Sequence, residues 1–320
     1  MKKIYFLGVL FFAFLFSGEI QAQTEETQVV FYPTSFGISR PLSEIAAENP
    51  YVETSKTRII KEQPDRANRP PQTFIYTAAD GPEYGEDTTT WQTTMGTRDI
   101  SNRAPLMNWQ GQTYTLGRPM DPSGAADDQY YLQAINSTPF RVYNKSTGAA
   151  VTAATNIGNL WSPATANAGD PIIIYDRFAD RWVLTQFGSS NQIYIAVSTS
   201  GDPTGTYYTY TFISPEFPDY LKFSIWGDGY YMTSNQTTDK IYVFERDQLL
   251  AGNPSARGIY STFTTGTVAA FFCPLPADAA DNTVLPTVGT PLPFVAYYDN
   301  GWGGGTDGVK IWNVTTNWTT

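Results

Sequence analysis

Between residues 170 and 212, short runs of alternating apolar and polar residues are separated by turn-forming residues, and no stretch has the periodicity of a helix. The sequence DPIIIYDRFADRWVLTQFGSSNQIYIAVSTSGDPTGTYYTYTF predicts four β-strands joined by three tight turns. Residues 221–263 have the same plan. Four-stranded units that recur about every 45–50 residues are typical of a β-propeller. The pattern therefore predicts an all-β protein made of four-stranded antiparallel blades.

The third strand of each unit shows the repeat most clearly. Its candidates are PFRVYNKSTG, QIYIAVSTSGDPTG, KIYVFERDQLLAGNP and GVKIWNVTTN, each with period-2 alternation that continues into a polar turn region. If Phe140, Ile193, Ile241 and Val309 are equivalent, the spacings are 53, 48 and 68 residues. The long last interval contains a Pro/Ala/Asp-rich insertion. We therefore predict at least four blades, near 128–161, 170–212, 221–263 and 292–320.

The last predicted blade ends at Thr320, where its outer strand should begin. A propeller closes by pairing its first and last strands, which removes exposed edges. We therefore expect the sequence to be the N-terminal part of a longer protein. The alternative is that residues 23–118 supply the missing strands. Those residues predict an irregular extension with strands at TQVVFYP and QTFIYTA, and a helical turn in SRPLSEIAAEN capped by Ser43.

The first 22 residues predict a cleaved signal peptide. Lys2 and Lys3 precede an apolar run from Ile4 to Phe16, and small residues follow up to a predicted cleavage after Ala22. The run is too short to span a bilayer. We expect an exported chain, secreted or held at the cell surface, with no transmembrane segment after cleavage.

Composition excludes several kinds of chemistry. Loss of Lys2, Lys3 and Glu19 changes the net charge from −10 to −11, and such an acidic chain repels nucleic acid. Because histidine is absent, Ser-His-Asp and Cys-His catalysis and His-ligated metals are excluded. The single cysteine, Cys273, predicts a buried, inert thiol. We expect no haem, flavin or nucleotide, so chemistry would depend on carboxylates, tyrosines, hydroxyls or a bound cation.

Residues 117–148 resemble a secreted bacterial propeller family that has Pro-Asp-x-x-Gly-x-x-Gly before a Tyr-Val-Gln-x-x-Asn strand and an x-Tyr-x-Lys-x-Thr-Gly hairpin. The positions that match this pattern are Asp121, Gly124, Tyr131, Gln133, Asn136, Tyr143, Lys145, Thr147 and Gly148, whereas Asp127 replaces the second glycine. The resemblance extends over roughly 117–318. It implies a surface protein of the kind that Bacteroidetes export as type IX secretion cargo, with a sialidase-like or arabinanase-like architecture. It implies no particular activity.

Aspartates recur where the first strand of a blade is predicted to begin. They are Asp127 and Asp128 before YYLQ, Asp170 before PIIIYD, and Asp219 before YLKFS. Since first strands line the channel of a propeller, these carboxylates are candidates for calcium binding at Asp127 and Asp128. Asp170 and Asp219, with Glu216 as the acid, are candidates for glycoside hydrolysis. The alternative is that each aspartate caps a turn.

Aromatic residues offer faces on which a sugar could stack, and Trp226, Tyr298 and Trp302 are the candidates. Trp302 lies in the glycine-rich segment DNGWGGGTDG, in which Asp299 and Asp307 are further candidate calcium ligands. The alternative for this segment is a mobile hairpin tip. By contrast, Asp202 in SGDPTGTY resembles the structural Asp-box turn of sialidase-like propellers.

These observations predict an exported propeller that acts as a binding or adhesion module for an extracellular glycan or protein surface, with calcium support. One alternative is a glycoside hydrolase with paired carboxylates at the channel mouth. The other is a purely structural module of a larger surface protein.

Overall fold

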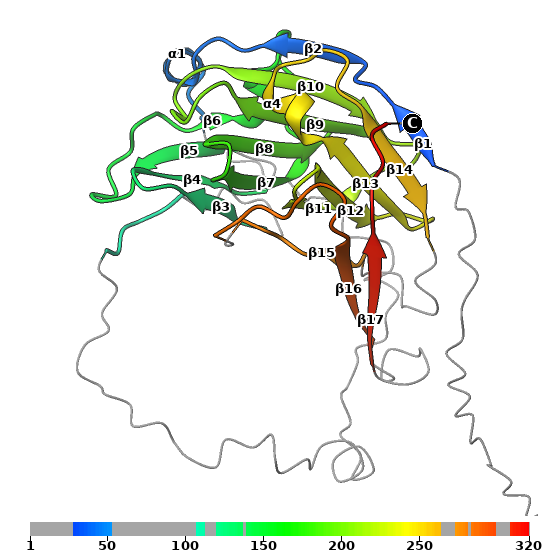
Figure 1. Ribbon diagram of the computed structural model, residues 1–320. Coiled ribbons are helices and arrows are strands. Elements are labelled where there is room, and N and C mark those ends of the chain that lie inside the picture. The colour runs from blue at the N-terminus through cyan, green and yellow to red at the C-terminus, as the bar shows by residue number, and fades with distance from the viewer. Residues whose placement is uncertain are drawn as a thin grey trace, which may run out of the picture.

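The computed structural model describes residues 28–52, 107–112, 120–136, 139–263, 273–280, 283–298 and 308–319. Strands dominate the described residues and form four sheets in which every pair is antiparallel (Figure 1). The predicted all-β, antiparallel class is therefore confirmed. The described strands do not close into a ring. No described helix is long and apolar enough to cross a membrane.

Apart from two edge strands supplied by the N-terminal residues, the strands of each sheet form a meander in chain order. The first sheet contains β3 (Ser123–Ala126), β4 (Tyr130–Ala134), β5 (Pro139–Asn144) and β6 (Thr155–Asn156). The second contains β7 (Gly169–Asp176), β8 (Arg181–Phe187), β9 (Gln192–Ser198) and β10 (Tyr207–Ile213). The third contains β11 (Asp219–Ile225), β12 (Gly229–Asn235), β13 (Lys240–Glu245) and β14 (Gly258–Thr262). The fourth contains β15 (Leu275–Pro276), β16 (Leu292–Tyr298) and β17 (Gly308–Val314).

The strand pattern of the second sheet explains how the sheets pack. Along β9, Ile193, Ile195 and Val197 face the core shared with the third sheet. The alternate residues Tyr194 and Ala196 face the core shared with the first sheet. Both faces of the strand are apolar because the sheet lies between two others. A third core lies between the third and fourth sheets.

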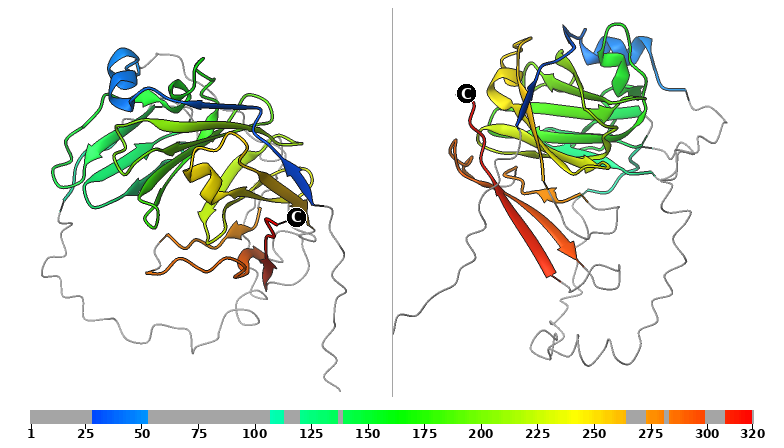
Figure 2. Two further views of the ribbon diagram at one scale, coloured as in Figure 1. Left: turned by 45° about the horizontal axis from the view of Figure 1, so that its top comes forward. Right: turned by 90° about the vertical axis from the view of Figure 1, so that its right-hand side faces the viewer.

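The sheets follow one another with their first strands adjacent (Figure 2). Strand β3 contacts β7, β7 contacts β11, and β11 contacts β15. The prediction that YYLQ begins a first strand was wrong, because β3 precedes it and YYLQ belongs to the second strand, β4. The sequence of β3, SGAA, is short and lacks the β-branched and aromatic residues that mark strands.

Two short helices and a 3-10 turn complete the described elements: α1 (Leu42–Glu48), η1 (Ile157–Leu160) and α4 (Arg246–Leu250). Helix α1 occurs where a helical turn was predicted, but the predicted cap was wrong. Its N-cap is Pro41, which makes no side-chain hydrogen bond, and Ser43 lies inside the helix. Helix α4 replaces a predicted polar turn, and its Leu249 is fully buried.

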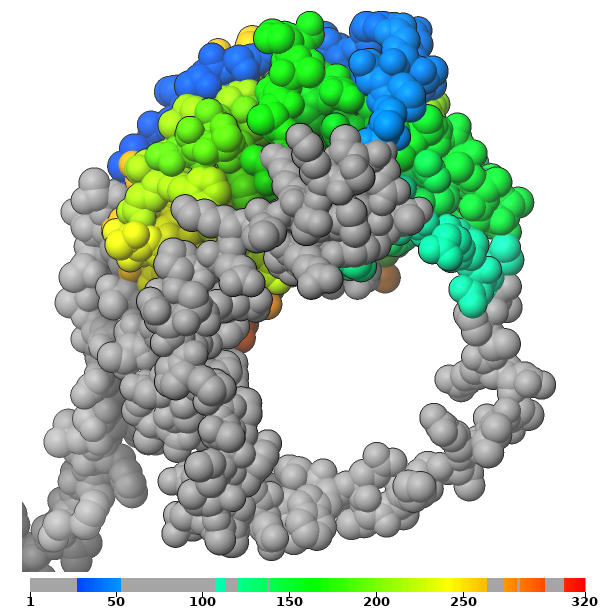
Figure 3. All heavy atoms as spheres, turned by 180° about the vertical axis from the view of Figure 1, so that it is seen from behind, coloured from blue at the N-terminus to red at the C-terminus, as the bar shows by residue number. Residues whose placement is uncertain are grey.

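Residues 28–52, here called the N-terminal belt, run along the outer edges of three sheets (Figure 3). Strand β1 (Val29–Phe31) pairs with β14, and β2 (Ser35–Ile38) pairs with β10. Further on, the Tyr51 N–H donates to the Ala154 carbonyl of the first sheet. The belt covers edges that would otherwise expose unpaired backbone groups. The other predicted strand of the extension, QTFIYTA, lies outside the described residues.

Candidate functional site

The first strands of three neighbouring sheets begin at residues with an unusual backbone. Asp121, Asp170 and Tyr220 have φ angles of 33°, 46° and 56°, in the left-handed region that residues with a side chain rarely adopt. At Asp170 and Tyr220 the pairing register of the strand also shifts, as in a β-bulge. Bulges redirect side chains, and strained backbone is concentrated at functional sites. The three strand starts therefore form the first candidate region.

Hydrogen bonds join these strand starts across three sheets. The Asn136 amide donates to Asp121 Oδ2 at 2.9 Å and accepts from the Asp170 N–H at 3.0 Å. The Tyr220 N–H in turn donates to Asp170 Oδ2 at 3.2 Å. Asn136 lies in the connection between β4 and β5 of the first sheet, and its side chain is buried. We call Asp121, Asn136, Asp170, Asp219, Tyr220 and Lys222 the strand-start cluster.

Burial perturbs the two central charges of this cluster. The Asp170 side chain is 8 % exposed, and its burial, reinforced by the charges of Asp219 and Asp121, raises the pKa of the carboxyl to about 7. Burial lowers the pKa of the Lys222 ammonium to about 8, although Cys273 and the three aspartates oppose this shift. The ammonium lies over the Tyr220 ring in a cation–π contact. Both groups therefore titrate close to neutral pH.

Two exposed aromatic rings lie at the edge of the cluster. Tyr220 is 37 % exposed and Phe217 is 40 % exposed. Phe217 packs edge-on against Phe187 with the ring centroids 4.9 Å apart. Phe187 is the register partner of Gly169, so Phe217 is anchored beside the start of β7. Apolar ring faces and polar side chains thus lie together at this end of the first strands.

Of the three predicted catalytic carboxylates, the structure brings two together. The negative charge of Asp219 raises the pKa of Asp170, so these two carboxylates lie close together. Glu216 instead forms its bonds with other residues. Glu216 forms an ion pair with Lys240 at 2.6 Å and accepts the Thr238 N–H at 3.1 Å. Burial opposes these bonds, but their net effect is to lower the pKa of Glu216. A glycosidase acid needs a raised pKa, so Glu216 does not suit that role.

The predicted calcium ligands Asp127 and Asp128 lie at the opposite ends of the first strands. Asp127 follows β3, and its carboxylate accepts the N–H groups of Gln129 and Tyr130. This is the turn-capping role that the sequence left open. Asp127 and Asp128 therefore do not share a strand end with Asp170, because β3 separates them from Asp121. Among the described residues, no group of three or more His, Cys, Asp or Glu side chains is placed to hold a metal ion.

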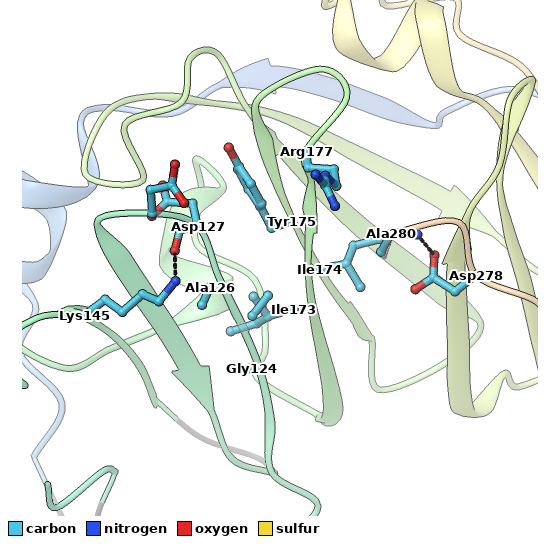
Figure 4. Close-up of a pocket in the computed structure, with 12 residues that line it drawn as sticks. Gly124, Ala126, Asp127, Lys145, Ile173, Ile174, Tyr175, Arg177, Asp278 and Ala280 are labelled. Carbon is cyan, nitrogen blue, oxygen red and sulfur yellow. Dashed lines mark hydrogen bonds between the residues drawn. The ribbon is translucent and has the colours of Figure 1, made fainter. Parts of the chain in front are cut away.

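Asp127 and Asp128 line a groove of about 640 Å³, here called the strand-end groove (Figure 4). Its apolar part comes from Ala125, Ala126, Ile173 and Ile174 in β3 and β7. The charged side chains around it are Asp127, Asp128, Lys145, Arg177 and Asp278. Lys145 donates to the Asp127 carbonyl, and the Ala280 N–H donates to Asp278 at 3.0 Å. Internal hydrogen bonds therefore occupy part of this polar rim.

The predicted aromatic ligand contacts are not brought together. Trp226 is only 9 % exposed, and its indole N–H donates to the Thr290 carbonyl at 2.9 Å, so the ring packs in a core and presents no free face. The Tyr298 backbone ends β16, but its side chain is not among those described. Trp302, Asp299 and Asp307 lie outside the described residues.

Two further predicted residues have clear positions. Asp202 accepts the N–H and the hydroxyl of Thr204, each at 2.8 Å, in an exposed turn between β9 and β10. Cys273 is partly buried, and burial raises the pKa of its thiol. The Cys273 N–H donates to Asn235 Oδ1 at 3.3 Å, in the way that the Asp170 N–H donates to Asn136. Cys273 thus begins the fourth sheet as Asp170 begins the second.

Sequence reasoning missed Asp121, Asn136 and Lys222 as members of the cluster. One signal was available, since Asp121-Pro122, Asp170-Pro171 and Cys273-Pro274 each place a proline at a strand start. Proline is tolerated at the first residue of a strand, where no ladder hydrogen bond is lost. Asn136 and Lys222 carry no comparable local signal.

Comparisons with protein-family models, curated proteins and solved structures give no match to this chain. The resemblance of residues 117–148 to secreted propellers therefore stays a prediction.

Proposed function

We propose that this protein is an exported β-propeller module that binds an extracellular glycan at the strand-start cluster. The propeller architecture is supported by four consecutive antiparallel sheets that share cores face to face. It is supported further by the succession of contacts between first strands. In a propeller these strands surround the channel, and ligands bind at its mouth. Residues at the start of each first strand would face that mouth.

The observation that carries the proposal is the combination of rings and charges at one strand end. The exposed ring of Phe217, and the face of the Tyr220 ring that Lys222 does not cover, offer apolar surface for the C–H groups of a sugar. Asp170, Asp219 and Lys222 lie beside them and offer acceptors and a donor for hydroxyl groups. A few polar groups that orient a ligand against an apolar surface are typical of small-molecule sites. A protein surface that carries such sugars is the corresponding partner.

Glycoside hydrolysis is the second candidate function, and the Asp170 carboxyl is the observation that favours it. A carboxylic acid with a pKa of about 7 can donate a proton near neutral pH, as a glycosidase acid does. Asp219 or Asp121 would then have to serve as the second carboxylate. Without Glu216, the arrangement departs from the three-carboxylate set that the sequence predicted. Binding without catalysis is therefore our leading proposal, and a purely structural module is its remaining alternative.

The test uses the purified chain on a glycan array, followed by titration calorimetry with any glycan that binds. Tyr220→Ala removes a stacking face and Asp170→Asn removes a charge without changing shape. Each should weaken binding at least about tenfold, which corresponds to ~1.4 kcal/mol. Asp202→Asn is the matched control, because it changes the same residue type in a peripheral turn, and it should bind like the parent chain.

Three outcomes decide between the functions. Loss of binding in Tyr220→Ala and Asp170→Asn, but not in Asp202→Asn, supports the proposed site. Equal binding by all four chains, or no binding to any glycan, would reject it. Turnover of aryl glycosides by the parent chain but not by Asp170→Asn would instead support hydrolysis.

A further inference from the structure

The junction between the third and fourth sheets contains a buried carboxylate with an unused oxygen. Asp228 lies in the tight turn that joins β11 to β12, and its side chain is 7 % exposed. Its Oδ1 accepts the Tyr231 hydroxyl at 3.0 Å. Its Oδ2 is buried and has no hydrogen-bond partner among the described residues. A buried carboxylate oxygen without a partner is costly, so something is expected to neutralise it.

Asp176, at the turn after β7, shows how the same molecule neutralises another buried aspartate. Asp176 is fully buried, and Arg246 donates to its two oxygens at 2.7 and 3.1 Å. The Tyr230 hydroxyl adds a third bond at 2.8 Å. Among the described residues, no cationic side chain forms an ion pair with Asp228. Asp228 therefore lacks, among the described residues, the positive partner that Arg246 provides for Asp176.

Polar groups from three separate segments meet at the turn that contains Asp228. The Tyr231 hydroxyl also bonds the Thr316 hydroxyl at 2.8 Å, which brings the segment after β17 to the turn. The Trp318 indole N–H donates to the Asp228 carbonyl at 2.8 Å. On the other side, the Pro286 carbonyl approaches Gly227 so closely that a Cβ there would lie 1.8 Å from its oxygen. Glycine is required at this position because of that approach.

We propose that Asp228 binds a calcium ion at the junction of the third and fourth sheets. The carboxylate is the charged ligand, and the Thr316 hydroxyl and the Pro286 carbonyl are the nearby neutral oxygens. Calcium prefers such hard oxygen ligands and accepts irregular geometry. With a single carboxylate, the affinity should fall at the weak end, roughly 10⁻⁴–10⁻³ M, which is usual for extracellular modules.

Two physical consequences follow from this site. Burial raises the pKa of the Asp228 carboxyl, and a bound cation would oppose this shift by favouring the ionised form. The ion would also join the turn of the third sheet to the segment that follows β17. The site lies apart from the strand-start cluster and does not depend on the proposed glycan.

Terbium luminescence and thermal unfolding of the full chain test the proposal. Terbium replaces calcium at oxygen sites, and excitation of nearby indole and phenol rings, here Trp318 and Tyr231, sensitises its emission. We expect sensitised emission that calcium displaces. We also expect 10 mM CaCl₂ to raise the melting temperature by about 2–5 °C relative to NaCl of equal ionic strength.

Variants locate the response. Asp228→Asn keeps the shape and the Tyr231 bond but removes the charge, and it should lose both the emission and the calcium-dependent shift. Thr316→Val should weaken both if the variant retains the parent circular dichroism spectrum. Asp127→Asn is the matched control from another turn after a first strand, and it should respond like the parent chain.

Several results would overturn the assignment. An unchanged response in Asp228→Asn, or loss of the response in Asp127→Asn instead, would place calcium elsewhere. A melting temperature that calcium does not raise would reject the proposed site. An Asp228→Asn chain that is more stable than the calcium-saturated parent would support the same conclusion.

Discussion

The third sheet packs against a neighbouring sheet on each of its two faces. Each of these two junctions contains a buried aspartate, but the two aspartates have different bonding partners. Towards the second sheet, Asp176 is paired with Arg246 and bonded to Tyr230 inside the core. Towards the fourth sheet, Asp228 has one oxygen bonded to Tyr231, and the other has no hydrogen-bond partner in the part of the chain that the structure describes. Both junctions pack apolar side chains between antiparallel sheets. The repeat of strands therefore does not make the junctions equivalent, and a few long-range polar contacts distinguish them.

The N-terminal belt increases the difference, because it crosses the junction between the second and third sheets. Strand β1 adds to the third sheet and β2 adds to the second. The ring of Phe31, the last residue of β1, contacts Phe212 of the second sheet and Tyr242, Phe244 and Tyr260 of the third. The outer strand of the fourth sheet, β17, pairs only with β16 among the described strands. The junction between the second and third sheets is thus stabilised both by a buried ion pair and by the N-terminal belt.

The largest expected effect comes from breaking the buried ion pair. Arg246→Met removes the guanidinium and leaves the Asp176 carboxylate buried and unpaired, which should cost about 3–5 kcal/mol of unfolding free energy. Urea denaturation measures this loss. Asp176→Asn in the Arg246→Met background should restore part of it, because the uncompensated charge is then absent.

Arg40→Met serves as the control for that experiment. Arg40 pairs with Glu44 and Glu48 at the surface, so its loss should leave stability unchanged within error. A loss below about 1 kcal/mol for Arg246→Met would mean that charge pairing does not distinguish the two junctions.

A smaller effect is expected from removing the anchor of the belt. Phe31→Ala deletes the ring that joins the two sheets and should cost about 2–4 kcal/mol, below the usual range for a fully buried phenylalanine because Phe31 is only half-buried. Chemical denaturation and hydrogen exchange at β10 and β14 measure it. Tyr32→Ala, at the adjacent residue that is 55 % exposed, should change little. Equal losses in the two variants would contradict an anchoring role for Phe31.

The smallest expected effect concerns Asp170, which ties the starts of β7 and β11 together. Its pKa is about 7 in the folded chain against 3.8 for an ordinary aspartate, so the folded state holds a proton that the unfolded state has lost. The associated stability is complete below pH 4 and is lost as the pH rises through 7. We expect this loss to be on the order of 1–3 kcal/mol.

Comparison with the Asp170→Asn variant isolates the pH-dependent stability that Asp170 contributes. The variant carries no titrating group at that position, so its unfolding free energy should fall less between pH 4 and pH 7 than that of the parent chain. Asp202→Asn should keep the slope of the parent. Parallel pH profiles for the parent and Asp170→Asn would show that Asp170 is not perturbed.

Local sequence predicted most of the strands correctly. The alternation of Ile193, Ile195 and Val197 is visible within one strand, and so are the turn residues on each side of it. It failed at β3, whose small residues carry no strand signal. It also failed to separate the aspartates at strand starts from those at strand ends, because both kinds lie beside a strand in the sequence.

The candidate site was less predictable than the fold. Asp170 and Asp219 were identified because each precedes a clear strand. Asn136 was not, since its role depends on bonds to Asp121 and Asp170 from two different sheets. Glu216 was chosen for its nearness in sequence to Asp219, but its carboxylate forms an ion pair with Lys240.

The sequence by itself determined an all-β chain of antiparallel meanders, because hydrophobic alternation and turn residues act over a few positions. Only the tertiary structure decided which edges the belt covers, which carboxylates meet at the strand starts, and which buried aspartate has an arginine. Such contacts join residues as far apart as Asp176 and Arg246, or Phe31 and Tyr260. Their geometry follows from how the sheets pack against one another, and no local pattern encodes it.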